Sequence, residues 1–218
     1  MLLIGMTSTA AYGTEVSETV QNLIRSKNVT VIYNPNPEEP FLNQKNESNS
    51  FLLQTPMITI QQAFIDKGFN VLDPTAEAIN CYIIHFQAQV STVKGTEISE
   101  ATAMIQAILQ EVGTGKVITK VESKGMKEFP KTDSGVDLMQ NLSAALKQSA
   151  EQIAPKLTNS LIEILYEHAE SGVPVMVNLS AGESKHIRPF MRMLKRIKGV
   201  TNLKGWYSSV KQLIMRIN

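Results

Sequence analysis

The sequence is poor in the residues that most metal and disulfide sites need. Among its 218 residues it has one cysteine, Cys81, and three histidines, His85, His168 and His186. A single cysteine excludes a disulfide within the chain, and no Cys-x-x-Cys pair or Cys/His cluster suggests zinc. The histidines are not spaced to bind a metal together, so we expect structural roles for them and no cofactor.

Long apolar runs and aromatic residues are also scarce. No run reaches the roughly 20 residues of a membrane-spanning helix, and aromatic residues make up only 6% of the chain, with one tryptophan, Trp206. The GxSxG pattern of a nucleophile elbow is absent, and the sequence offers no constellation that supports an enzyme. Hydrophobic residues still make up 43%, enough for a packed core.

The net charge of +1 hides an uneven distribution. From Gly172 to Asn218 there are nine Lys/Arg and one acid, which gives +8; the remainder has 12 basic and 19 acidic residues, which gives −7. This split favours an anionic partner for the C-terminal part, or the acidic part of a neighbouring copy. A head-to-tail contact of the second kind closes into a ring when the rotation allows.

The N-terminal segment, "MLLIGMTSTAAYG", is apolar first and then small and polar. Its end, Ala11-Tyr12-Gly13, suits signal peptidase cleavage before Thr14. We therefore predict a periplasmic protein in which residues 1–13 are the remnant of a signal peptide. No cysteine follows the cleavage site, so we expect no lipid anchor. The alternative is an apolar first helix that packs on the core of a cytoplasmic protein.

The first part of the chain alternates between helical and strand patterns. We predict a helix over Glu15–Lys27, a strand over Asn28–Asn34, a loop over Pro35–Ser50, a helix that starts at Thr55-Pro56 and stops at Gly68, and strands over Phe69–Asp73 and Cys81–Val93. This order indicates an α/β layer.

The stretch "EVGTGKVITK" contains Gly113-Thr114-Gly115-Lys116, which looks like a phosphate-binding loop. A P-loop needs GxxxxGK[ST] opening into a helix, but here the spacing is missing and a strand pattern follows. On the other side, the odd positions from Ala101 to Leu109 are all apolar, which is typical of a strand with one buried face. We therefore predict a β-hairpin in which Gly113 and Gly115 supply positive φ.

The rest of the chain predicts a long helix and a small module. Apolar residues recur at helical spacing over Asp133–Ser171, where Pro155 either kinks the helix or starts a second one. His168 near the end of this segment is a candidate partner of the helix dipole. Residues 173–218 then read β-α-β-β, with the helix over Glu183–Ile197. The predicted fold class is α/β (α+β): a mixed sheet with a long β-hairpin packed by a long helix, followed by that module.

The hairpin and its surroundings resemble a known group. An Ala- and Gln-rich strand, the turn Glu111-x-x-Thr114-Gly115-x-Val117, a returning strand ending in Lys124-Gly125 and an Ala-rich helix resemble the periplasmic α/β domain of the curli secretion lipoprotein, the penicillin-binding-protein activators and flagellar assembly protein T. In that group the first turn residue is typically Asp. The resemblance covers roughly Val29 to Gly172.

The resemblance implies a domain over residues 14–172 and a structural turn at Gly113, Thr114 and Gly115. It implies a non-enzymatic structural or assembly component of a cell-envelope complex, of the flagellar-ring or secretion-associated type. Its partners would be proteins in a homo- or hetero-oligomeric assembly. The family's role is scaffolding at the outer membrane, without catalytic residues to carry over.

The basic helix of the C-terminal module is the candidate partner-binding surface. Its face could be merely solvated, dock an acidic neighbour, bind nucleic acid, or contact an anionic lipid at the outer membrane. The alternative function is accordingly a cytoplasmic nucleic-acid-binding module, although no GxxG loop is present and few aromatic residues are near. The residues of this hypothesis are Lys185, Arg188, Arg192, Lys195, Arg196, Lys198 and Trp206.

Overall fold

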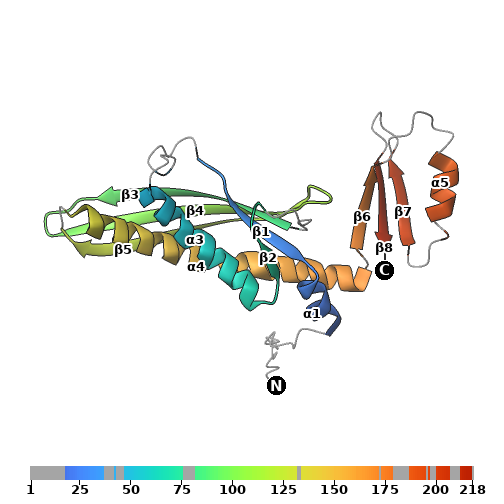
Figure 1. Cartoon of the computed structure of the whole chain (residues 1–218), viewed down its shortest axis with the longest axis horizontal. Helices are drawn as coiled ribbons and strands as arrows, with labels where there is room; N and C mark the ends of the chain where they lie inside the picture. Colours follow the sequence, from blue (N-terminus) through green and yellow to red (C-terminus); the bar gives the residue numbers. More distant parts are fainter. Residues whose placement is uncertain are drawn as a thin grey trace, which may run out of the picture.

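The chain forms two β-sheets, each accompanied by helices (Figure 1). The structure is a computed structural model, and it describes residues 18–36, 42, 47–75, 82–131, 134–171, 173–178, 187–194, 196, 200–206 and 212–217. The proposed signal-peptide remnant, residues 1–13, lies outside the described residues, as do Cys81 and His186.

The first sheet has five strands in the order β2-β1-β3-β4-β5. Its elements are α1 (Glu18–Arg25), β1 (Asn28–Tyr33), α3 (Glu47–Asp66), β2 (Asn70–Leu72), β3 (Tyr82–Val93), β4 (Ile98–Glu111), β5 (Val117–Pro130) and α4 (Gly135–Ser171). β1 is parallel to both of its neighbours, and α3 provides the crossover to β2. β3, β4 and β5 form an antiparallel meander. The predicted mixed sheet with a long hairpin is confirmed.

The alternating pattern of β4 produces one fully buried face. The odd-numbered residues Ala101, Ala103, Ile105, Ala107 and Leu109 are all 0% exposed. In the neighbouring strand, Ile84 pairs with Leu109 and Phe86 with Ala107, so the buried rows of the two strands coincide. The sequence prediction for this strand is therefore confirmed.

α4 covers this buried face as one continuous helix of 37 residues. Pro155 lies inside it, so the predicted second helix beginning at this proline is wrong. The apolar stripe outweighs the cost of the proline, because Ile153 and Leu157 on either side are both 0% exposed in the core.

α4 lies very close to the sheet at Gly125 of β5. A Cβ atom at this position would lie 1.9 Å from the carbonyl oxygen of Ala145 and 2.8 Å from the amide nitrogen of Ser149. Beside it, the Ser123 hydroxyl donates to the Ser149 carbonyl oxygen (2.7 Å), and the Ser149 hydroxyl donates to the Ser123 carbonyl oxygen (3.0 Å). We predicted that the strand ends at Gly125, but β5 continues to Pro130, because this glycine accommodates the helix rather than a turn.

α3 starts earlier than the sequence suggests. The predicted loop over Pro35–Ser50 and helix start at Thr55-Pro56 are wrong where the structure describes them, since the helix begins at Glu47 and Pro56 lies inside it. Leu52, Ile60 and Phe64 lie four or eight residues apart on the side that faces the core, and each is 0% exposed. Their burial selects the helix despite the proline.

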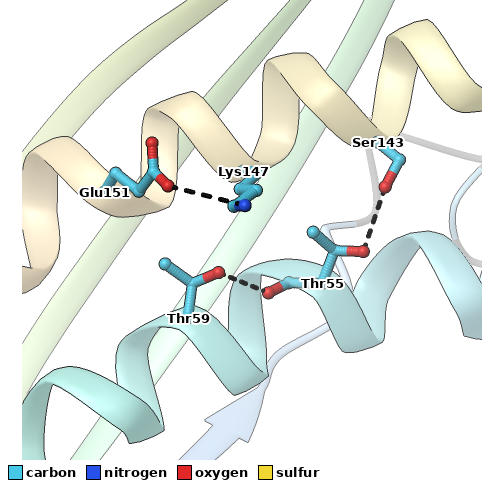
Figure 2. Close-up of polar contacts among 5 residues, drawn as sticks. All are labelled: Thr55, Thr59, Ser143, Lys147 and Glu151. Carbon is cyan, nitrogen blue, oxygen red and sulfur yellow. Dashed lines mark hydrogen bonds and ion pairs between the residues drawn. The ribbon is translucent and has the colours of Figure 1, made fainter.

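α3 and α4 lie side by side on the same face of the sheet (Figure 1). Figure 2 shows the polar contact between them, where the Thr55 and Ser143 hydroxyl oxygens are 3.0 Å apart. In α3 the Thr59 hydroxyl also donates to the Thr55 carbonyl oxygen, at 2.8 Å. Together the two helices seal one side of the five-stranded sheet.

The second sheet has the order β6-β8-β7 and is antiparallel throughout. Its elements are β6 (Val173–Asn178), α5 (Ile187–Leu194), β7 (Val200–Trp206) and β8 (Gln212–Ile217). The predicted β-α-β-β order is present. Of the predicted helix over Glu183–Ile197, α5 is the part that the structure describes as helix. The domain boundary between residues 172 and 173 stays a prediction.

We expect Gly125→Ala to destabilise the protein by about 2–3 kcal/mol, because the helix backbone must move to admit the methyl group. Urea unfolding followed by circular dichroism measures this change. Gly113→Ala is the control: a Cβ atom there meets nothing within 4 Å, so its effect should stay within about 0.5 kcal/mol. Equal stability of the two variants would show that α4 is not held at this distance.

Candidate interaction surfaces

The turn between β4 and β5 is held by hydrogen bonds among its own residues. The Glu111 amide donates to the Lys116 carbonyl oxygen, and the Gly115 amide donates to the Glu111 carbonyl oxygen, both at 2.9 Å. The Thr114 hydroxyl donates to the Glu111 carboxylate. These contacts explain what an acid, a threonine and a glycine do at this spacing: they close the turn.

Only one of the two glycines in this turn needs its conformational freedom. Gly115 has φ of 70°, whereas Gly113 is not among the glycines with positive φ, so that part of the prediction is wrong. A hairpin turn requires left-handed backbone only at particular positions, and the Thr114 hydroxyl stabilises the rest by accepting from the Lys116 amide at 3.2 Å.

No described helix packs on the opposite face of β3, β4 and β5, which we call the bare face. Here the side chains of Lys120, Glu122 and Lys124 on β5 are exposed, while the even-numbered residues of β4 from Glu100 to Gln110 are half-buried between their neighbours. Gln106 on β4 lies opposite Gln87 on one side and Glu122 on the other, and its amide donates to the Glu122 carboxylate at 2.7 Å.

One end of the bare face is apolar and hollowed. Val93 is 64% exposed, Ile98 60% and Met126 47%, and the strand alternation puts all three on this face. Beside them is a recess of about 550 Å³. It is lined by Gln89, Val90, Ser91, Val93, Glu100, Thr102, Met104 and Lys124. The recess has a mixed lining, in which Glu100 and Lys124 bring opposite charges beside apolar Val93 and Met104. Exposed apolar side chains next to such a recess are suited to binding a partner.

This apolar end was not predicted from the sequence. The alternation from Ala101 to Leu109 predicts one buried face for β4, but it does not show that large apolar side chains at the end of the other face stay exposed. The signal that could have found them is the placement of Val93 and Ile98 on either side of the short connection between the two strands, where a soluble turn usually carries polar residues.

Two of the three histidines lie in the described part of the chain. His85 is half-buried in β3 and faces the bare side, and its Nδ1 atom is buried without a hydrogen-bond partner among the described residues. His168 in α4 is only 8% exposed, and its Nδ1 atom is likewise unpartnered within that part of the chain.

The expectation that His168 is a charged partner of the helix dipole is not supported. Burial lowers the pKa of His168 below its ordinary value of 6.5, and nearby Lys27 and Lys116 act in the same direction. Glu111 and Glu167 oppose this shift but do not overcome it. His168 is therefore neutral at pH 7, where it packs α4 near the β4–β5 turn.

The basic C-terminal surface is described only in part. Arg188 and Arg192 lie in α5, and the side chains of Arg192 and Arg196 are exposed. Trp206 is the last residue of β7. Lys185, Lys195 and Lys198 lie outside the described residues. The partner-binding hypothesis for this set stays a prediction.

The described residues contain neither a cluster of metal ligands nor a helix suited to spanning a membrane. No three His, Cys, Asp or Glu side chains in this part of the chain are grouped so that they could hold a metal ion. Among the same residues, no helix is both long enough and apolar enough to cross a bilayer.

Comparison with known proteins gives only distant structural likenesses. No protein-family model matches the sequence, and no curated protein matches it. A candidate lipoprotein from Caulobacter crescentus is 10% identical, with a TM-score of 0.41 over 68% of this chain and 96% of that one. A minor lipoprotein from Acinetobacter baumannii is also 10% identical, with a TM-score of 0.39 over 62% and 92%.

A third solved structure is the PelC dodecamer from Paraburkholderia phytofirmans. It is 15% identical, with a TM-score of 0.33 over 58% of this chain and 88% of that one. With identities and TM-scores this low, these structures assign neither a family nor a function to this chain. The resemblance to the curli, penicillin-binding-protein activator and flagellar families therefore stays a prediction.

The buried His168 should make stability depend on pH. Because its folded-state pKa is lowered from 6.5, the unfolded chain binds the proton more readily, so the native protein loses free energy of unfolding as pH falls below about 6.5. The variant His168→Gln removes the contribution of this histidine to the pH dependence of the free energy of unfolding. Urea titrations of both proteins from pH 8 to pH 5 should show the wild type losing stability relative to the variant over the acidic half. Parallel pH profiles would exclude His168 as a source of acid sensitivity.

Proposed function

We propose that this protein is a non-enzymatic assembly component of a bacterial cell-envelope complex that works through protein contacts. The observation that carries the proposal is the apolar, hollowed end of the bare face. Val93, Ile98 and Met126 are large apolar side chains on one uncovered side of a sheet, where water otherwise contacts them. A partner that covers this patch removes its apolar surface from water, and the hydrophobic effect then stabilises the complex.

The composition of the bare face suits a protein partner. Its middle consists of uncharged Gln87, Gln89, Met104 and Gln106. Most of its charges lie along the edge strand β5, and Glu100 adds one charge beside Val93. Protein interfaces share this plan, because charges are costly to bury at the centre and harmless at a solvated rim.

The cell-envelope part of the proposal is supported by the sequence of the hairpin. The turn Glu111-x-x-Thr114-Gly115-x-Val117 resembles the turn of periplasmic domains from flagellar-ring and secretion-associated proteins, and here the acid and the threonine close it. Together with the signal-peptide pattern of residues 1–13, this favours the periplasm. The exposed Arg192 and Arg196 would then give a second contact to an acidic protein.

The location is tested by the intact mass of the protein purified from its native cells. We expect a mature chain that starts near Thr14, because the small residues before it suit signal peptidase. A chain that retains Met1 would contradict export. The basic surface should then be tested against RNA and DNA, the alternative that the sequence leaves open.

The binding face is tested by a photo-crosslinking amino acid at Val93 in the native cells. We expect cross-links to an envelope protein, because this side chain is the most exposed of the three at the apolar end. The matched control is Val136 in the first turn of α4, which is equally exposed at 67% but lies away from the bare face. Equal cross-linking from the two positions, or none from Val93, would refute the bare face as the contact.

A further inference from the structure

α3 carries an exposed apolar stripe on the side that faces away from the core. Phe51 is 59% exposed, Ile58 56% and Ile65 50%. The three residues are seven apart, so they lie in one line along the helix. Leu52, Ile60 and Phe64 already fill the buried side of the same helix. The stripe is therefore an additional apolar surface that the described part of the chain does not cover.

The stripe is also free of charge over its whole length. Between Glu47 and Asp66 the helix has no charged residue, and the exposed positions Gln54 and Gln62 between the apolar ones are neutral. At the C-terminal end, the Gln62 amide donates to the Asp66 carboxylate at 2.7 Å. Surface helices in soluble proteins usually carry charges on the outer face, and their absence together with apolar residues marks the centre of an interface.

We propose that this stripe binds a second copy of the chain, with the two α3 helices antiparallel about a two-fold axis at Ile58. The stripe is symmetric about this residue, because Phe51 and Ile65 are each seven positions away. A two-fold axis there places Ile58 on Ile58 of the second copy and Phe51 against Ile65 of the second copy, twice. Such self-complementarity is what an isologous contact requires.

The charge pattern favours this occupant over an unlike partner. An isologous contact brings each residue near the axis close to its own copy, so any charge there would meet a like charge. In α3 the nearest charges, Glu47 and Asp66, lie eight or more positions from Ile58, which is about 12 Å or more along the helix. The α3 side chains near the two-fold axis are therefore all neutral.

The flank of the stripe is compatible with the same contact. On the neighbouring helix, Lys147 and Glu151 form an ion pair at 3.8 Å with both side chains more than half exposed (Figure 2). This pair adds no net charge beside the stripe, and the Thr55–Ser143 contact joins the two helices beneath it. The dimer uses the helical side of the sheet, so it does not depend on the proposed function of the bare face on the other side.

Sedimentation velocity of the full chain tests the association. We expect a dimer at about 100 µM and little change between about 50 and 500 mM salt, because the contact is apolar. Ile58→Lys places two like charges on the axis and should weaken the dimer at least about thirtyfold. Val136→Lys, at an exposed valine on α4, is the matched control and should leave it unchanged. Circular dichroism confirms that each variant is folded.

A pair of cysteine variants tests the antiparallel register, in a Cys81→Ser background. Phe51→Cys and Ile65→Cys proteins should form a mixed disulfide when they are combined, because the two positions meet across the axis. Phe51→Cys alone should not cross-link efficiently, since its own copy would be about 20 Å away. A chain that stays monomeric, a dimer that Ile58→Lys does not weaken, or a dimer that dissociates in salt would overturn the proposal. Binding of another protein or a vesicle by a monomer would do the same.

Discussion

The contact between α4 and β5 determines how the first part of the chain is organised. Because Gly125 has no side chain, the backbone of α4 at Ala145 can approach the strand to a distance that no other residue allows. The reciprocal hydrogen bonds of Ser123 and Ser149 then satisfy two buried hydroxyl groups at the same point. The contact fixes both the height and the position of a long helix over the meander, and α3 packs beside it. One face of the sheet is consequently sealed, and none of the described helices packs on the other.

The arrangement within each element could be predicted from the sequence where residues repeat with a regular period. The odd-numbered apolar residues of β4 and the stripe of α4 are long, periodic signals, and both describe the buried surfaces correctly. The start of α3 could not be predicted, because Pro56 is a strong local signal for the first turn of a helix, and the burial that overrides it depends on contacts with distant strands. The continuation of β5 beyond Gly125 could not be predicted for a related reason. A glycine in a strand pattern suggests that the strand ends there, and only the helix packed against it shows its actual role.

The same difference between local sequence signals and long-range packing applies to the candidate interaction surfaces. The β4–β5 turn forms locally, so its position could be predicted from the sequence, although the positive φ predicted for Gly113 was wrong. The apolar end of the bare face could not be, since alternation shows that a strand has two different faces but not that one remains uncovered. The exposed stripe of Phe51, Ile58 and Ile65 could not be predicted either, because apolar residues at helical spacing are normally assigned to the core. The structure shows that a different side of α3 faces the core, since Leu52, Ile60 and Phe64 are fully buried.

The two apolar surfaces lie on opposite sides of the sheet, and this has a consequence for assembly. A contact through α3 leaves the bare face of each copy free, so a two-fold pair presents two identical binding faces that are rigidly linked through their cores. Two linked faces bind a repeated target with a higher effective concentration than separate copies, without any new contact. A weak contact at the apolar end, which holds only a few large side chains, is then sufficient for stable attachment to a complex with repeated subunits. In the proposed dimer, the α3 stripe would therefore strengthen attachment indirectly: it would make the assembly bivalent, and the bare face would supply the specificity.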